Sequence, residues 1–290
     1  MFRLYTASLA LVLTGLLISV KNATAPMAAI QAMSASLRPP ASPASSAYDS
    51  NAERELLRLA NESRARAGAP PLREDPGMTQ AARTHTAAMM RRQQLSHQFP
   101  GEPGLMPRVT ASCSLHLDQA AENVASSGSA AGAHDGLMHS PPHRENLLNP
   151  AYNVVGIGAM WNGNVLYVTE DFAHSLPTYS EADAEKAVAE SVARTRRDAG
   201  MRGLRWIENA AARTTACAMA RADSIDVSGP PGHTNLRYTT MRPENLPSSA
   251  ARVIDDPGTQ GFAVGSCYAR TVSYPSGVYW VALIFYSAIN

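Results

Sequence analysis

The sequence VVGIGAMWNGNVLYVT, residues 154–169, gives the clearest structural signal in the chain. Two runs rich in β-branched and aromatic residues flank Asn162-Gly163, and a type I′ turn needs positive φ at both of its central residues. The stretch therefore predicts an antiparallel hairpin. Helical patterns precede this hairpin, so the sequence indicates an α+β fold and not an alternating parallel one.

The helical patterns upstream have recognisable ends. Ser50 and Glu53 form a capping box at the start of an amphipathic stretch that Gly68 terminates. Asp75-Pro76 opens a second helix, which we expect to end near Leu95. Further along, the pattern predicts a loop over residues 100–118 and a helix over residues 130–137.

The N-terminus has the features of an export signal. Arg3 precedes a 17-residue apolar run from Leu4 to Val20, and Ala23-Thr24-Ala25 follows as a small-residue cleavage site. Residues 1–25 are therefore predicted to be a signal peptide, and the Pro- and Ser-rich residues 26–50 a linker. Pro26 is a poor neighbour for a signal peptidase, so the alternative is an uncleaved membrane anchor.

Composition limits the partners. The chain has 290 residues, of which 45% are hydrophobic and 17% charged, as in a globular protein. The formal net charge is only +1, which provides no field to attract nucleic acid or an anionic membrane surface. We therefore expect a small molecule, a lipid or a protein as partner, and no strong membrane association after signal cleavage.

Three cysteines, Cys113, Cys217 and Cys267, permit one disulfide within the chain at most. Export favours disulfide formation, and we prefer the pair Cys217–Cys267, since both lie in the same half of the chain. Three buried thiols are the alternative.

The second half of the chain resembles the first. Four matches occur in the same order, and the β runs of both halves end in an aromatic-rich strand, at Phe172 and Phe285. We therefore expect a duplicated unit of about 110 residues, with domains at 51–176 and 183–290. The matched pairs are Ala67–Arg73 with Ala199–Arg205, Ala88-Met89 with Ala218-Met219, Glu122–Ala125 with Glu244–Pro247, and Gly156–Gly158 with Ala263–Gly265.

Five polar residues of the first half are candidates for a site: His97, Glu122, Asn123, Ser140 and His143. They are too far apart for a local motif, so the fold would have to assemble them. Structural roles are the alternative for Glu122, Asn123 and His143, which can tie loops together or stabilise a helix start. Other histidines are expected to be structural, with His85 packed in the core and His134 and His139 at exposed helix positions.

Residues 52–174 resemble the CAP superfamily, named for cysteine-rich secretory proteins, antigen 5 and pathogenesis-related 1. The segments that carry the resemblance are Leu95–His97, Glu122–Ala125, Ser140–Leu148 and Val155–Gly158, and they are most similar to bacterial members. The resemblance implies an α-β-α sandwich whose cleft commonly holds two histidines and two acidic residues. It assigns His97 and His143 to the histidine positions and Glu122 to one acidic position, whereas the second acidic position falls near Ser140 and is lost.

This residue set predicts binding more than catalysis. Two neutral imidazoles can hold a divalent ion such as zinc weakly and exchangeably, with water or Glu122 completing the site. The leading hypothesis is an exported, non-catalytic binding or scaffold module whose cleft takes a divalent metal, a lipid, a small ligand or a partner loop. The alternatives are a metal-dependent hydrolase or peptidase using His97, Glu122 and His143, and a purely structural extracellular or envelope protein.

The second half is expected to lack this site. Asp226 or Val227 stands where His97 would fall, Ser248–Arg252 replaces the segment of His143, and Glu244-Asn245 is retained. We expect the protein to be secreted or periplasmic, or membrane-anchored if the N-terminal segment stays attached.

Overall fold

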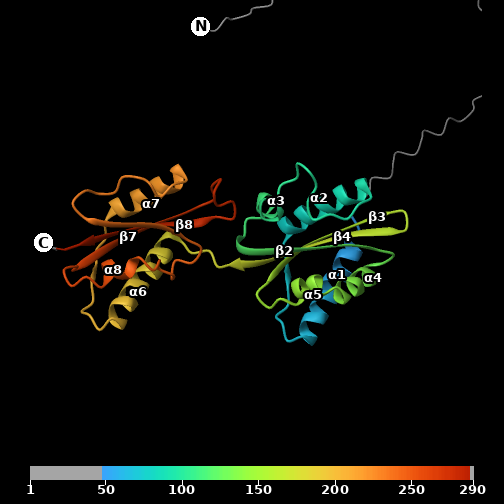
Figure 1. Ribbon diagram of the computed structural model, residues 1–290, viewed down its shortest axis with the longest axis horizontal. Coiled ribbons are helices and arrows are strands. Elements are labelled where there is room, and N and C mark those ends of the chain that lie inside the picture. Colours follow the sequence, from blue (N-terminus) through green and yellow to red (C-terminus); the bar gives the residue numbers. More distant parts are fainter. Residues whose placement is uncertain (1–47, 288–290) are drawn as a thin grey trace, which may run out of the picture. The chain divides into compact units, whose positions relative to one another are not determined.

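The computed structural model describes residues 48–287, which hold two four-stranded sheets, each with helices on both faces (Figure 1). The predicted signal peptide and almost all of the predicted linker lie outside the described residues. None of the helices in the described part of the chain is both long and apolar enough to cross a membrane.

The first sheet has the strand order β1-β3-β4-β2. Its strands are β1 (Arg73–Glu74), β2 (His116–Ser127), β3 (Val154–Asn162) and β4 (Val165–Leu176), and only the β1–β3 pair is parallel. Asn162 pairs with Val165 at the end of the predicted hairpin, and Gly163 has a φ of 59° in the turn. The hairpin prediction is confirmed, but the predicted type I′ turn over Asn162-Gly163 is wrong, because Asn162 still pairs in the strand without a positive φ and the turn is centred on Gly163 and Asn164.

Helices cover both faces of this sheet. Helices α2 (Pro76–Arg92) and α3 (Leu105–Ser112) pack on one face, and α1 (Ser50–Arg66), α4 (Ala130–His139) and α5 (Pro141–Leu148) on the other (Figure 1). The first core contains Leu56, Ile157 and Phe172, and the second contains Met78, Val109 and Leu117. This layering agrees with the expected α-β-α sandwich.

Two local predictions need correction. The N-cap of α1 is Asp49, whose side chain accepts hydrogen bonds from the amides of Asn51 and Ala52. Glu53 makes no capping box, because it forms an ion pair with Arg83 and accepts a hydrogen bond from the Ala159 amide instead. The loop expected over residues 100–118 contains helix α3 and the start of β2.

The second sheet, of order β5-β7-β8-β6, has the same pattern of parallel and antiparallel pairs as the first. Its strands are β5 (Arg205–Trp206), β6 (Thr234–Thr240), β7 (Gly261–Ala269) and β8 (Val278–Tyr286), and its helices are α6 (Glu181–Asp198), α7 (Ala210–Ala222) and α8 (Ala250–Ile254). Helix α7 covers one face, and α6 and α8 cover the other (Figure 1).

The two halves share a close contact between a helix and a glycine of the sheet. A Cβ atom on Gly158 would lie 2.6 Å from the Ala82 backbone in α2, and one on Gly265 would lie 2.1 Å from the Ala212 backbone in α7. Beside each glycine a glutamate–arginine ion pair links two helices, Glu53–Arg83 in the first half and Glu185–Arg213 in the second. Gly158 and Gly265 therefore occupy corresponding positions.

A buried arginine provides a second correspondence. Arg64 of α1 is 0% exposed and donates hydrogen bonds to the carbonyls of Pro70, Leu147, Asn149 and Tyr152. Arg196 of α6 is 3% exposed and donates in the same way to the carbonyls of Arg202, Ile254, Asp256 and Thr259. In both halves one guanidinium therefore holds the first helix to the loops that follow it.

Candidate functional site

The candidate site lies at β2, the edge strand of the first sheet. Successive residues of a strand point to opposite faces, and here Glu122 faces α2 and α3 while Asn123 faces α1, α4 and α5. Glu122 is paired with Asp171 on β4, and Asn123 with Glu170. Within residues 48–287, no further strand covers the outer side of β2, so side chains from the helices on both faces of the sheet can approach each other there. Residues that are distant in the sequence can therefore lie side by side at this edge.

The Glu122 carboxylate is buried and held at both oxygens. The Nδ1 atom of His97 lies 2.9 Å from Oε1, and the Nη2 atom of Arg108 donates a hydrogen bond to Oε2. Burial raises the pKa of Glu122, and the Arg108 guanidinium opposes this by favouring the charged form. The carboxylate thus fixes the ring of His97 through the Nδ1–H group.

Two further residues join Glu122 from the α2 side. His85 of α2 is fully buried, with Nδ1 2.6 Å from Oε1 of Glu102 and Nε2 2.7 Å from the Ser96 carbonyl. Its Nε2 atom lies 3.8 Å from Oε2 of Glu122. The core position expected for His85 is confirmed, and the histidine also belongs to the hydrogen-bonded surroundings of the site.

Glu102 supplies a second acidic group. Besides its contact with His85, it accepts a hydrogen bond from the Phe99 amide and lies 3.7 Å from Nη1 of Arg108. The family resemblance implied no second acidic residue in the cleft, and Glu102 was not among the predicted site residues. An acidic residue five positions after His97, in the same loop, is the signal that could have identified it.

Two buried carboxyl groups on β4 were also missed. Asp171 and Glu170 are both 0% exposed, and Asp171 lies directly across from Glu122 in the sheet. Burial raises the pKa of Asp171 well above its usual range, and the neighbouring Glu122 charge adds to this effect. Two adjacent acidic residues that directly follow the apolar run Val165–Val168 and Thr169 are an unusual pattern, and this pattern was the available signal.

The second histidine comes from the opposite layer. His143 lies on α5, and its Nδ1 atom is 2.8 Å from the hydroxyl of Ser140, the residue that precedes this helix. Asn123 donates a hydrogen bond of 3.0 Å to the His143 carbonyl and accepts one from Asn146. All five predicted site residues are therefore connected to one another at this edge, Asn123 and Ser140 as groups that position His143.

The two histidine rings face each other. Their centroids are 6.4 Å apart, with 26° between the ring planes, and the His97 side chain is 59% exposed. Partial burial lowers the pKa of His97, aided by the charges of His85 and Arg108. Burial and the neighbouring His97 lower the pKa of His143. Both imidazoles are therefore neutral at physiological pH, the form that binds metal ions.

This arrangement offers two metal ligands rather than three. Within the described part of the chain, the Nε2 atoms of His97 and His143 have no hydrogen-bond partner, whereas both Nδ1 atoms do. Among these residues, the one group of three ligand atoms lying within 4.8 Å of one another is elsewhere, at Glu181, Cys217 and Cys267. Two imidazoles are fewer than the four protein ligands that a closed structural zinc site requires.

The other histidine predictions had mixed outcomes. His139 is exposed, as expected. The exposed position expected for His134 is wrong, because it is 7% exposed and its Nε2 atom lies 2.9 Å from the Ser63 hydroxyl of α1.

The expected match of Glu244-Asn245 with Glu122-Asn123 is also wrong. In the first sheet Gly158 pairs with Thr169, two residues before Asp171, the partner of Glu122. In the second sheet Gly265 pairs with Ala282, and Ile284, two residues on, pairs with Asn235. Asn235 therefore corresponds to Glu122, and Glu244 lies in the turn after β6 because that strand is shorter than β2.

Residues 57–172 match the family model CAP, the cysteine-rich secretory protein family. We refer to the first half, residues 48–176, as the CAP domain from here on. The matched segment contains every residue of the site described above.

Individual relatives are distant and match the chain in part. Uncharacterized protein YkwD of Bacillus subtilis (strain 168) is 28% identical over 116 residues, which are 39% of this chain and 44% of the relative. An extracellular protein containing a SCP domain from Bacillus anthracis str. Ames is 26% identical, with a TM-score of 0.39 and coverage of 43% of this chain and 40% of that one. A cysteine-rich secretory protein from Staphylococcus aureus subsp. aureus Mu50 is 19% identical, with a TM-score of 0.34 and coverage of 43% and 39%. This chain thus covers less than half the length of each of these relatives.

Proposed function

We propose that the CAP domain is an exported, non-catalytic binding module in which His97 and His143 hold a divalent cation weakly. The hydrogen bonds at the two Nδ1 atoms carry this proposal, because they fix each ring while leaving its Nε2 atom available. A carboxylate or hydroxyl bonded to the far nitrogen of a histidine is the usual support of a metal-binding imidazole. Glu122 is then a positioning residue for His97, and Ser140 for His143.

The neutral state of both rings supports the same function. A protonated imidazole has no lone pair for a metal, and the lowered pKa values of His97 and His143 keep both rings neutral. A bound zinc ion would supply a Lewis-acid centre with open coordination positions, which an acidic group of a small ligand, a lipid headgroup or a partner loop could occupy. The protein's own residues supply orientation, and the exposed His97 ring leaves access from solvent.

Calorimetric titration with zinc tests the proposal. Wild type should bind one ion with micromolar or weaker affinity, and His97→Ala and His143→Ala should each abolish the binding heat. His139→Ala is the matched control, since His139 is exposed and outside the site. Equal heats for wild type and both cleft variants would show that the metal is bound elsewhere or not at all.

Metal-dependent hydrolysis is the second candidate, and the burial of Glu122 favours it. A carboxylate with a raised pKa is a better proton acceptor near neutral pH. Both oxygens of Glu122 are engaged by His97 and Arg108, however, so binding is the better-supported function. Turnover of peptide or ester substrates that requires zinc and is lost in Glu122→Gln would establish the hydrolase.

We further propose that residues 183–290 are a degenerate CAP-like copy with a structural or partner-binding role. Its support is the shared strand order, the corresponding Gly265 and the buried Arg196, while Val227 and Asn235 replace His97 and Glu122. Zinc binding that survives deletion of residues 180–290 would agree with this division of roles. Loss of the zinc heat in a truncated protein that keeps the circular dichroism of a folded CAP domain would contradict it.

Export itself is part of the proposal. Two of the relatives are named as extracellular or secretory proteins, and the N-terminal sequence has the composition of a signal peptide. N-terminal sequencing of the protein from a culture supernatant or periplasm would locate the cleavage site. A start at Met1 in the membrane fraction would indicate the anchored alternative.

A further inference from the structure

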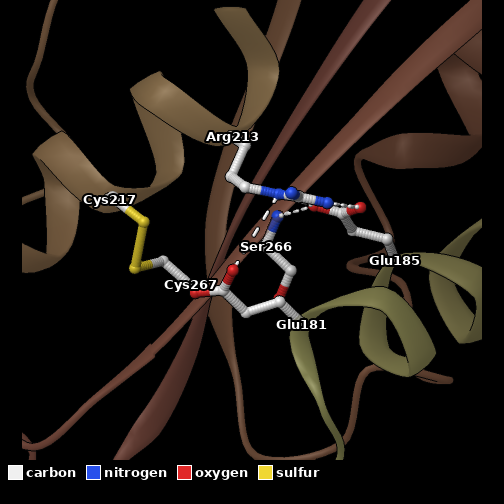
Figure 2. Close-up of a disulfide and its surroundings, with 6 residues drawn as sticks. All are labelled: Glu181, Glu185, Arg213, Cys217, Ser266 and Cys267. Carbon is white, nitrogen blue, oxygen red and sulfur yellow. Dashed lines mark hydrogen bonds and ion pairs between the residues drawn. A yellow bond between two sulfur atoms is a disulfide. The ribbon is translucent and has the colours of Figure 1, made fainter. Parts of the chain in front are cut away.

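The second half holds a group of metal-binding side chains away from the CAP cleft. Cys217 of α7 and Cys267 of β7 form a disulfide, as preferred from the sequence, with 5.1 Å between their Cα atoms. Glu181, the first residue of α6, places a carboxylate oxygen beside the two sulfur atoms, and the three ligand atoms all lie within 4.8 Å of one another (Figure 2). Each residue comes from a different element of the fold.

We propose that reduction of this disulfide creates a binding site for a thiophilic divalent cation such as zinc, formed by Cys217, Cys267 and Glu181. Zinc binds thiolate sulfur at about 2.3 Å and carboxylate oxygen at about 2.1 Å, so its ligand atoms lie within about 4.6 Å of one another. The three side chains satisfy this limit nearly as they stand. In a tetrahedral site the two sulfurs would be about 3.8 Å apart, which rotation of the cysteine side chains can provide.

The charges around the group leave Glu181 available. Arg213 is the nearby cation, but it forms a two-bond ion pair with Glu185, at 2.8 and 2.6 Å, while its distance to Glu181 is 4.0 Å (Figure 2). The Glu181 side chain is also about half exposed, at 50%. It can therefore turn toward a metal without breaking a buried interaction.

Access from solvent is open as well. A surface cavity of about 750 Å³ is lined by Cys217 together with Trp206, Arg213 and Arg221. Neither cysteine is fully buried. A reductant and a hydrated ion can therefore both reach the sulfur atoms, unlike the thiol of Cys113, which is buried.

The CAP domain shows that the fold does not require a cross-link at this place. Strand pairing and the glutamate–arginine pairs place Ala87 and Met160 at the positions corresponding to Cys217 and Cys267. Both residues are buried and pack without any covalent bond. The thiols are thus an addition to this half of the chain, with Glu181 beside them.

The chemistry balances with a phosphine as reductant. The phosphine attacks one sulfur, the S–S bond breaks, and water converts the phosphonium to the phosphine oxide, leaving two thiols. Zinc then displaces one proton from each thiol, giving two Zn–S bonds and two released protons. Glu181 binds as the carboxylate, and water fills the fourth position.

Zinc retention by the full chain tests the site. The protein is reduced with a phosphine under nitrogen, incubated with zinc, dialysed, and assayed by elemental analysis, with His97→Ala in the background to remove the CAP-cleft ion. We expect one zinc per chain after reduction and none in the oxidised protein, and with cadmium as probe a sulfur-to-metal charge-transfer band in the near ultraviolet.

Variants separate the three ligands from the rest of the chain. Cys217→Ala with Cys267→Met copies the residues of the CAP domain, retains Cys113, and should fold without binding zinc. Glu181→Gln should weaken binding at least tenfold, whereas Glu190→Gln, an exposed acid of the same helix, should not change it. Zinc retention that is equal in the reduced and oxidised protein, or a reduced protein that unfolds without retaining zinc, would overturn the proposal. Unchanged affinity in Glu181→Gln would remove Glu181 from the site.

Discussion

The two sheets of this protein have the same strand order, yet they differ in what they bury. The CAP domain places Glu122, Glu170 and Asp171 inside the fold, whereas Asn235, Leu283 and Ile284 occupy the corresponding positions of the second half. Burying carboxyl groups is costly, and the second sheet forms with an amide and two apolar side chains at the same places. This strand order therefore does not require carboxyl groups at these three places.

The largest effect is expected where the two halves agree. Arg64→Ala should lower the free energy of unfolding by about 4 kcal/mol, because four carbonyls lose a charged donor in the interior. Arg196→Ala should cost the second half a similar amount. Urea denaturation followed by circular dichroism measures both. A loss below about 1 kcal/mol for either variant would show that the two arginines are not equivalent.

The disulfide should distinguish the halves. Cys217 and Cys267 are 50 residues apart, for which the chain-entropy model gives a stabilisation of about 4 kcal/mol, and strain commonly reduces this value. Cys217→Ala with Cys267→Met should therefore shift the unfolding of the second half to lower urea and leave that of the CAP domain unchanged. Fluorescence of Trp280 and Trp161, each kept as the only tryptophan, can follow the halves separately. An equal shift in both would mean that they unfold as one cooperative unit.

Glu170 should make the stability of the CAP domain depend on pH. Burial raises the pKa of Glu170 to about 7 from 4.5, so the folded state binds more protons than the unfolded state between these values, and stability falls as pH rises through this range. The difference corresponds to about 3 kcal/mol. Glu170→Leu, which copies Leu283, should remove the part of this dependence that Glu170 contributes, leave the part that Glu122 and Asp171 contribute, and raise the melting temperature at pH 8.

Glu170→Gln is the control, because glutamine has nearly the same shape as glutamate and stays polar but does not titrate. It should remove the contribution of Glu170 as well, with a smaller gain at pH 8 because a buried amide still lacks partners. If the pH dependence were unchanged in both variants, it would have to arise from Asp171 and Glu122 alone.

The smallest effect should be at the cleft, which the second half lacks. Ser140→Ala should weaken zinc binding by about tenfold through looser orientation of His143, with little change in stability. Ser129→Ala, which removes the N-cap of α4 instead, should lower stability without changing zinc affinity.

In wild type, zinc affinity should fall only below pH 6.5, because the pKa values of both histidines are lowered. Loss of zinc binding above pH 7 would contradict this assignment.

Patterns within a few residues of each other were predictable from the sequence. The hairpin followed from two β-rich runs separated by a glycine-containing turn, although the turn lies one residue later than predicted, and α2 followed from the Asp75-Pro76 start, because turn and cap preferences depend on local backbone geometry. The family resemblance brought His97, Glu122 and His143 together correctly. Local sequence patterns did not predict β2. Polar and apolar residues are mixed along this strand, because it lies at the edge of the sheet and faces helices on both sides.

Groups defined by tertiary packing were not predictable in this way. Glu102 is linked to Glu122 only through His85 and Arg108, and Asp171 lies beside Glu122 only because β2 pairs with β4. His134 is buried only because α1 passes beside it. The match of Glu244 with Glu122 failed for a related reason. Strand register is set by pairing across the sheet, and a similar dipeptide in a later turn cannot reveal it.

The contacts of Gly158 and Gly265 with their helices have a consequence for how such a chain can diverge. Each contact sets the spacing between a helix and its sheet through backbone atoms, so the spacing does not depend on which side chains line the rest of the layer. Substitutions can then replace the residues of a cleft, or add a pair of thiols, while the dimensions of the scaffold stay the same. Two scaffolds of one size can in this way carry different side-chain chemistry.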